Sequence, residues 1–153
     1  MLSFRSIVGT LKRGSFALLL SAGFGVIAAG MPAADEIAIK GYDAVAYFKA
    51  GKAQQGIESF AFPWHGMTWY FMSKENRDLF AASPEQYAPQ YDGFCAWAMT
   101  EERKAITDPE VWTIVNGKLY LNCSRTAYEK WSSDIPGNIK KADRNWRKMQ
   151  GGN

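Results

Sequence analysis

The sequence predicts an α+β fold in which two small antiparallel hairpins carry packed helices, two of them at the C-terminus. Residues 59–64 place the aromatic side chains Phe60, Phe62 and Trp64 at every second position just before His65-Gly66, and Asn116-Gly117 separates two short apolar runs. Strict alternation is typical of a half-buried strand, and Asn-Gly is the strongest two-residue signal for a hairpin turn. Apolar side chains near the C-terminus recur with helical spacing, which predicts the closing helices.

The N-terminus is typical of a secretory signal. Residues 1–34 contain three basic residues and no acidic residue, and the run FALLLSAGFGVIAA at 16–29 is apolar and ends in small residues. A positive start, an apolar centre and small residues are the parts of a cleavable signal peptide. We therefore expect a signal peptide and short linker over 1–34 and a periplasmic or secreted protein. The alternative is a retained membrane anchor, since residues 16–34 carry no charge and are just long enough to span a bilayer.

The chain that follows the signal is electrically neutral. The whole sequence has 18 Lys and Arg against 15 Asp and Glu, and the three excess bases all lie within 1–34. Neutrality gives no reason to expect nucleic acid as a partner. Residues 35–150 suffice for one domain with its own core, with no evident internal repeat, and 151–153 are expected to form a disordered tail.

Strands are expected in three places in the first half of the domain. AVAYF at 44–48 predicts a short buried strand. SFAFPW at 59–64 and TWYFM at 68–72 predict a hairpin around His65-Gly66. In the second half, the residues on either side of Asn116-Gly117 predict another hairpin.

Helices are expected after each hairpin. Ser73 predicts the N-cap of a helix over 74–82, and Ser83-Pro84 starts a further helical turn. The segment QYDGFCAWAM at 90–99 is expected to run through the core. Two helices close the chain, and the last is amphipathic. Its expected apolar face carries Ile139, Ala142, Trp146 and Met149.

Several motifs resemble the YHS domain family. They are GYDAVAYF at 41–48, TWYFMSKENRDLFAASPEQY at 68–87 and PQYDGFCAWA at 89–98, followed by Trp112, GKLYLN, IPGNI and ADRNW. The later motifs are similar to the exported, single-domain bacterial branch of the family, so the resemblance implies a YHS-like domain over 35–150. The best-known members are small metal-binding modules. The cysteines of their metal-binding pattern have no counterpart here, so the resemblance does not transfer the family's metal function.

The candidate ligand-binding residues are Asp43, Tyr47, Tyr91 and Cys95. The sequence has six Trp in 153 residues, and a cleft lined by Trp and Tyr suits a small ligand or a peptide. Asp43 lies inside an apolar run, so a buried Asp43 needs a hydrogen-bond partner from a backbone turn or a ligand. We expect an exported, non-enzymatic binding domain with an aromatic-lined pocket, the alternative being that these rings only fill the core.

A second hypothesis for the function is a carrier of a soft metal ion, copper in particular. Its candidate ligands are His65, Cys95 and Met99, because thiolate and thioether groups select Cu(I) and imidazole can join them. These residues have no metal-motif spacing. Cys95 and Cys123 are the only cysteines, and they are either a possible disulfide or buried thiols. His65 is otherwise an exposed turn residue.

A third hypothesis is an accessory subunit that binds a partner protein and no small ligand. The basic face of the last helix could contact such a partner or, weakly, anionic lipid. The sequence contains no G-x-S-x-G, P-loop, H-E-x-x-H or G-x-G-x-x-G motif, so it gives no positive reason to propose a reaction.

Overall fold

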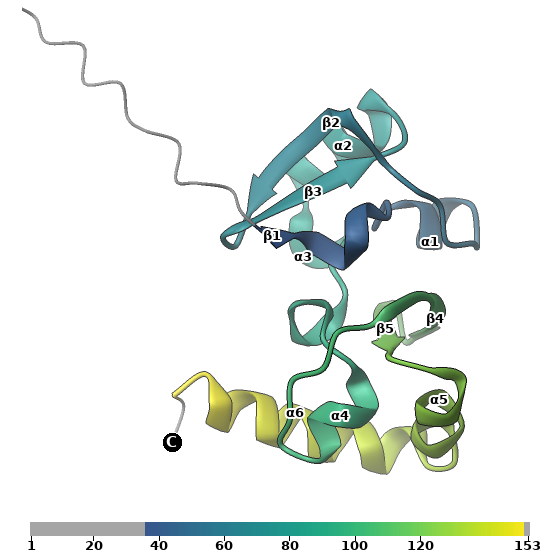
Figure 1. Cartoon of the computed structure of the whole chain (residues 1–153), viewed down its shortest axis with the longest axis vertical. Coiled ribbons are helices and arrows are strands. Elements are labelled where there is room, and N and C mark those ends of the chain that lie inside the picture. Colours follow the sequence, from purple (N-terminus) through teal and green to yellow (C-terminus); the bar gives the residue numbers. More distant parts are fainter. Residues whose placement is uncertain (1–35, 152–153) are drawn as a thin grey trace, which may run out of the picture. The chain divides into compact units, whose positions relative to one another are not determined.

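The computed structural model describes residues 36–151 (Figure 1). In chain order the elements are β1 (Glu36–Ile37), η1 (Ala38–Gly41), α1 (Ala46–Lys49), β2 (Ile57–Trp64), β3 (Met67–Phe71), α2 (Lys74–Ala82), α3 (Pro84–Tyr87), η2 (Gln90–Gly93), α4 (Ala96–Thr100), β4 (Asp108–Val115), β5 (Lys118–Asn122), α5 (Arg125–Ser132) and α6 (Ile135–Met149), where η marks a short 3₁₀ segment. The expected signal peptide over 1–34 and the last two residues of the expected tail lie outside the described residues.

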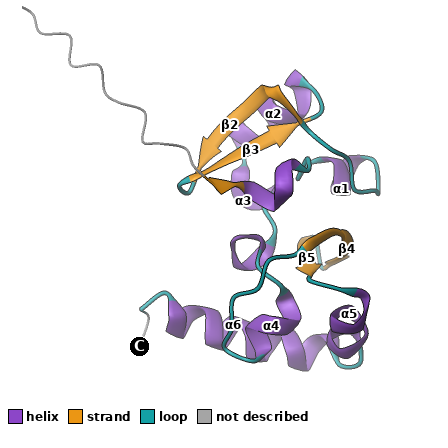
Figure 2. Cartoon of the chain, viewed as in Figure 1, coloured by secondary structure: helices purple, strands orange, loops and turns teal. Residues whose placement is uncertain are grey.

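The α+β prediction is confirmed (Figure 2). β2 and β3 form an antiparallel hairpin, and β1 adds to β3 in parallel to give a three-stranded sheet in the order β1-β3-β2. β4 and β5 form a separate antiparallel hairpin. Within residues 36–151, none of the helices has the length and apolar character needed to cross a bilayer.

Both hairpins turn at the dipeptides that the sequence indicated. His65 and Gly66 have φ angles of 51° and 75°, and Asn116 and Gly117 have 51° and 74°. Positive φ at both central residues is the signature of a type I′ turn, which matches the right-handed twist of paired strands. The left-handed region therefore favours the glycine at the second position of each turn.

The strand expected at 44–48 is wrong, because this segment forms a turn and the short helix α1. Asp43 Oδ1 accepts hydrogen bonds from the backbone amides of Val45 at 2.8 Å and Ala46 at 3.2 Å. An aspartate that accepts from the amide two residues on forms an Asx turn, and this turn leads into α1. The apolar run alone could not distinguish a buried strand from a buried helical turn.

The element order recurs within the described chain, which corrects the expectation that the chain contains no repeat. The first repeat is η1, α1, β2, β3 and α2, and the second is η2, α4, β4, β5 and α5. Each η segment ends in three consecutive residues with positive φ, Ile39-Lys40-Gly41 and Tyr91-Asp92-Gly93. Each hairpin is followed by a helix that a serine caps, since Ser73 accepts from the Asn76 amide and Ser124 from the Ala127 amide.

The irregularity of the hairpins also recurs. The pairing of β2 with β3 shifts register between Ile57 and Ala61, and the pairing of β4 with β5 shifts between Asp108 and Trp112. These residues lie at the same distance before Gly66 and Gly117 respectively. A register shift is a specific local feature of a hairpin, so its recurrence shows that the two halves share one backbone plan.

β5 contributes to two hydrophobic cores. Leu119 and Leu121 pack into the first core with residues of β3 and α2, whereas Tyr120 packs into the second core with residues of α4, α5 and α6. Successive side chains of a strand point to opposite faces, so this one strand joins both cores. The largest fully buried side chains of the two cores include Trp69, Phe71, Phe80, Met99 and Trp131.

The expected apolar face of α6 is confirmed except at its end. Ala142 is fully buried, and Ile139 and Trp146 pack against the second core. Met149 is 38% exposed and lies outside it. The polar residue Asn145 is buried on this face instead.

Candidate functional site

Asp43 is fully buried, and its carboxylate is occupied by groups of the protein itself. Besides the two amides at the start of α1, Asp43 Oδ2 accepts from the Met72 amide at 2.9 Å and from Asn76 Nδ2 at 2.7 Å. A carboxylate offers about four acceptor sites, and four protein donors use them. Asp43 therefore joins α1 to the end of β3 and the start of α2, and it does not face a ligand.

Tyr47 and Tyr91 are buried in different cores. The Tyr47 hydroxyl donates to the Pro109 carbonyl at 3.0 Å, and its ring lies edge-on to Trp112 at 5.1 Å. The Tyr91 hydroxyl donates to Asp143 Oδ1 at 2.8 Å. Burial raises the pKa of both hydroxyls, and the bonded carboxylate raises that of Tyr91 further, so both remain neutral donors.

Cys95 and Cys123 lie together and are not bonded to each other. Cys95 Sγ accepts a hydrogen bond from the Cys123 amide at 3.1 Å, and the Cys95 thiol donates to Asn122 Oδ1 at 3.8 Å. Both cysteines belong to one small apolar cluster with Ala98 and Ala127. Burial, the main cause, raises the pKa of the Cys95 thiol to about 11.

The four candidate ligand residues thus do not surround one cavity. Tyr47 belongs to the first core, Tyr91 to the second, and Cys95 to the small cluster at the start of α4. Each side chain is buried, and its polar atom has a partner in the protein. This corrects the expected position of the ligand site.

The three candidate soft-metal ligands are not brought together either. His65 is exposed on the β2–β3 turn, where its ring stacks on Trp64 at 3.8 Å, whereas Cys95 and Met99 are fully buried in separate clusters. Across residues 36–151, no group of three His, Cys, Asp or Glu side chains is placed to hold a metal ion. His65 is therefore an exposed turn residue, which was the alternative to its role as a metal ligand.

His65 has an acidic neighbour that is distant in sequence. Its Nδ1 lies 3.8 Å from Asp92 Oδ1. Asp92 belongs to η2, where it holds a left-handed φ of 52°. The contact joins the turn of the first repeat to η2 of the second, and local sequence could not reveal it.

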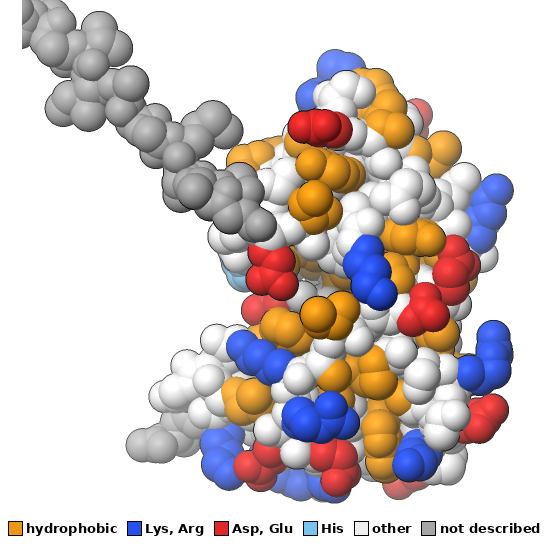
Figure 3. All heavy atoms as spheres, viewed as in Figure 1, with side chains coloured by type: hydrophobic (Ala, Val, Ile, Leu, Met, Phe, Trp, Pro, Cys, Tyr) orange, Lys and Arg blue, Asp and Glu red, His pale blue; other side chains and the backbone are white. Residues whose placement is uncertain are grey.

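A hollow of about 230 Å³ lies where the two repeats meet. The first repeat and the strand before it contribute residues 36–40 and Met67, and the second contributes residues 92–94 and 106–107. Two of the lining side chains are large, apolar and exposed: Ile37 at 49% and Ile106 at 73%. On the face of the molecule drawn in Figure 3, hydrophobic side chains reach the surface among charged side chains of both signs.

Sequence reasoning missed this hollow, although one signal was present. Ile106 is an isolated aliphatic residue in the polar stretch EERKAITDPE. An isolated apolar residue on a surface loop is common, and needs no explanation by itself. Only the fold shows that Ile106 shares a hollow with Ile37 and Met67.

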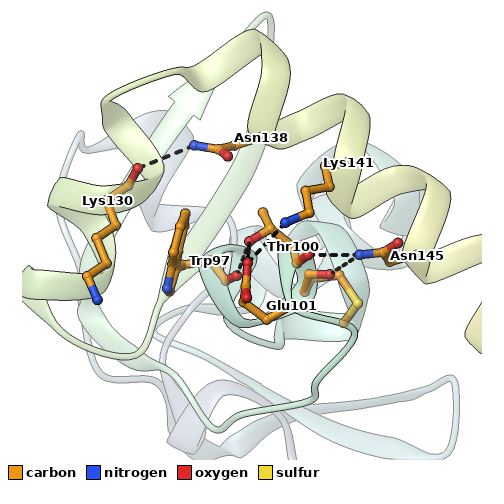
Figure 4. Close-up of polar contacts among 8 residues, drawn as sticks. Trp97, Thr100, Glu101, Lys130, Asn138, Lys141 and Asn145 are labelled. Atoms are coloured by element: carbon orange, nitrogen blue, oxygen red, sulfur yellow. Dashed lines mark hydrogen bonds and ion pairs between the residues drawn. The ribbon is translucent and has the colours of Figure 1, made fainter.

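The basic face of α6 is partly neutralised by the residues that follow α4 (Figure 4). Lys141 pairs with Glu101 at 3.1 Å and Lys148 pairs with Glu102 at 2.9 Å. Beside these exposed pairs, Asn145 Nδ2 donates to the carbonyl groups of Met99 at 2.9 Å and Thr100 at 3.0 Å. α6 is therefore fastened to the C-terminal end of α4, and its basic face is less free than the sequence suggests.

Comparison of the chain with protein-family models, with curated proteins and with solved structures finds no match. The resemblance to the YHS domain family therefore stays a prediction from the quoted motifs. Within the repeat, the motif GYDAVAYF, from Gly41, and the segment GFCAWAMT, from Gly93, both begin at the last residue of an η segment and contain the first helix of their repeat.

Proposed function

We propose that this chain is an exported, non-enzymatic binding domain of the YHS type and that it holds an extended peptide segment of a partner protein at the hollow. The observation that carries the proposal is the pair Ile37, on β1 before the first repeat, and Ile106, in the second repeat, two exposed aliphatic side chains that line one hollow. Covering exposed apolar surface contributes roughly 25 cal/mol per Å², so an apolar group seated between them would stabilise a complex.

The size of the hollow favours one aliphatic side chain as the occupant. Small-molecule and cofactor pockets have volumes of roughly 300–1,000 Å³, and this hollow has about 230 Å³. Glu36, Lys40 and Asp92 lie among its lining residues. They supply charges of both signs around the apolar floor, which suits the polar backbone of a peptide that inserts a single apolar side chain.

The neighbouring strand supports an extended conformation for that peptide. β1 lies at the edge of its sheet, because the strand order is β1-β3-β2. Its residues Glu36 and Ile37 also line the hollow. An extended peptide can add to an exposed sheet edge through main-chain hydrogen bonds while a pocket selects its side chain.

The proposal can be tested by titrating the ¹⁵N-labelled full chain with capped tetrapeptides whose central residue is Gly, Ala, Val, Leu or Ile. We expect saturable amide shifts at 36–40, 92–94 and 106–107 that grow with the size of the aliphatic side chain. Ile106→Asp should abolish the shifts. Ile57→Asp is the matched control, because Ile57 is 48% exposed on β2 and does not line the hollow.

Two results would contradict the proposal. One is an absence of saturable shifts with every peptide of the series. The other is binding that Ile106→Asp and Ile57→Asp weaken equally, since a general loss of surface hydrophobicity would then explain the effect.

A further inference from the structure

The second repeat places a thiol where the first repeat places a carboxylate. Asp43 and Cys95 each stand two positions after the end of an η segment and before the first helix of their repeat. The Cys95 amide donates to the Ala105 carbonyl at 3.0 Å, and the Asp43 amide donates to the Gln54 carbonyl at 2.8 Å. In the second repeat, the residue whose backbone amide donates to Cys95 Sγ is itself a cysteine, Cys123.

We propose that Cys95 and Cys123 form a redox-active dithiol that exchanges with external disulfides, with Cys123 as the attacking thiol and Cys95 as the resolving thiol. This activity is independent of the hollow and of what binds there. It assigns different roles to the two cysteines, which a simple structural disulfide would not require.

The contact between the two residues permits a bond between their sulfur atoms. Cys95 Sγ lies 3.1 Å from the Cys123 amide nitrogen, and that nitrogen is bonded to the Cα that carries the Cys123 side chain. Disulfides join residues whose Cα atoms are usually roughly 4.4–6.8 Å apart. The contact between Cys95 Sγ and the Cys123 amide brings the two backbones close to such a separation.

Burial determines which thiol reacts first. Cys95 is 0% exposed, whereas Cys123 is partly exposed. An external disulfide must contact the attacking sulfur directly, so only Cys123 is accessible to it in the folded chain. Cys95 is reached afterwards, from inside, by the sulfur already attached to Cys123.

The exchange balances with a small organic disulfide, RSSR, as the oxidant. The Cys123 thiolate attacks one sulfur of RSSR, the S–S bond breaks, and RS⁻ leaves as RSH after taking up a proton. The Cys95 sulfur then attacks Cys123 Sγ, the bond between Cys123 and the R group's sulfur breaks, and the departing RS⁻ takes up the Cys95 proton and leaves as RSH. The protein dithiol is oxidised by two electrons, and RSSR is reduced to two RSH.

Groups around Cys95 are placed to assist the second step. The Cys123 amide already donates to Cys95 Sγ, and a hydrogen bond to a thiolate favours its formation. Asn122 Oδ1 accepts from the Cys95 thiol, while Asn122 Nδ2 is buried without a hydrogen-bond partner in the described part of the chain. Asn122 Oδ1 also accepts from the Trp97 amide at 3.1 Å, which holds the Asn122 side chain beside Cys95.

The test uses the full reduced chain and oxidised glutathione as RSSR. In the native chain we expect both thiols to disappear together, with a Cys95–Cys123 bond found by peptide mapping and no glutathione retained. Cys95→Ser should accumulate a stable glutathione adduct on Cys123. Cys123→Ser should react at Cys95 at least about 100-fold more slowly, because exchange then requires local opening of the fold.

The proposal is overturned if the native chain keeps a glutathione adduct without forming the internal bond. It is also overturned if Cys95 in Cys123→Ser reacts as fast as Cys123 in Cys95→Ser. If Cys95→Ser does not fold, as judged by tryptophan fluorescence, Cys95→Ala takes its place. Equilibration of the native chain across glutathione redox buffers supplies a second readout, in which a reversible two-electron midpoint is expected and an irreversible or absent transition contradicts the proposal.

Discussion

Asp43 and Cys95 occupy equivalent positions in the two repeats, and each accepts a hydrogen bond from the first backbone amide after a hairpin. Met72, which follows β3, donates to Asp43 Oδ2 at 2.9 Å, and Cys123, which follows β5, donates to Cys95 Sγ at 3.1 Å. The same connection between the start of one helix and the end of a hairpin is thus made by a charged group in one half and by a thiol in the other.

Replacing Asp43 by Ala should strongly destabilise the domain. The change removes the acceptor of four buried or partly buried donors, among them the Met72 amide and Asn76 Nδ2. Breaking a buried charged network in this way costs about 3–5 kcal/mol. Urea denaturation followed by tryptophan fluorescence measures the loss. Asp78→Ala is the control, because Asp78 is an exposed partner of Lys74 and Arg77, and its midpoint should stay close to that of the native chain.

The equivalence of the repeats can be tested by building the Asp43–Asn76 pair of the first repeat into the second repeat. Asn76 donates to Asp43, and the matching position on α5 is Ala127, which packs in the cluster of Cys95. Cys95→Asp alone should destabilise the domain, because it buries a carboxylate with too few donors. Adding Ala127→Asn should recover part of the loss, with a coupling energy of about 1–2 kcal/mol in a double-mutant cycle. Strictly additive effects would contradict the equivalence.

Alkaline pH should weaken the reduced protein through Cys95. Burial raises the pKa of this thiol from 9.0 to about 11, so the folded chain holds the proton more tightly than the unfolded chain does. The contribution to stability is complete below pH 9 and is lost as the pH rises towards 11. Denaturation midpoints measured in a reducing agent at half-unit intervals should fall over this range. Cys95→Ala should make this fall smaller without abolishing it, because burial also raises the pKa of Tyr47 and Tyr91, and unfolded tyrosines begin to ionise in the same range.

Asn145→Ala should loosen the last helix. The side chain amide donates to two carbonyl groups at the end of α4, those of Met99 and Thr100. Leaving buried carbonyl groups without a donor costs about 1–3 kcal/mol. Hydrogen exchange should show faster opening of α6 together with a lower urea midpoint. Lys148→Ala is the matched control on the same helix, because its ion pair with Glu102 is exposed, and exchange in α6 should change little.

The hairpins and helix starts could be predicted from sequence because each is encoded by neighbouring residues. His65-Gly66 and Asn116-Gly117 specify two-residue turns by their tolerance of positive φ. Ser73 and the following residues encode a helix start in the same local way. The spacing of apolar residues encodes the buried face of α6. The prediction of this face is wrong only at Met149, which is exposed on the last turn.

The site could not be predicted, because it depends on contacts between distant residues. A buried carboxylate needs a partner, which makes Asp43 a ligand candidate from sequence, but its partners Met72, after β3, and Asn76, on α2, lie far along the chain. The strand expected at 44–48 is wrong for a local reason, because a short apolar run fits a buried strand and a buried helical turn equally well. The repeat was hidden for a related reason: equivalent positions differ in chemistry, as Asp43 and Cys95 do, while the backbone plan is retained.

The position of β5 and α6 late in the chain has a consequence for the time at which the protein can fold. The first core is incomplete without Leu119 and Leu121, and the second is incomplete without Ala142 on the last helix. During synthesis from the N-terminus, the first core cannot close before Leu121 has left the ribosome, and the second cannot close before Ala142 has. The order of the elements along the chain therefore delays the closure of both cores during synthesis.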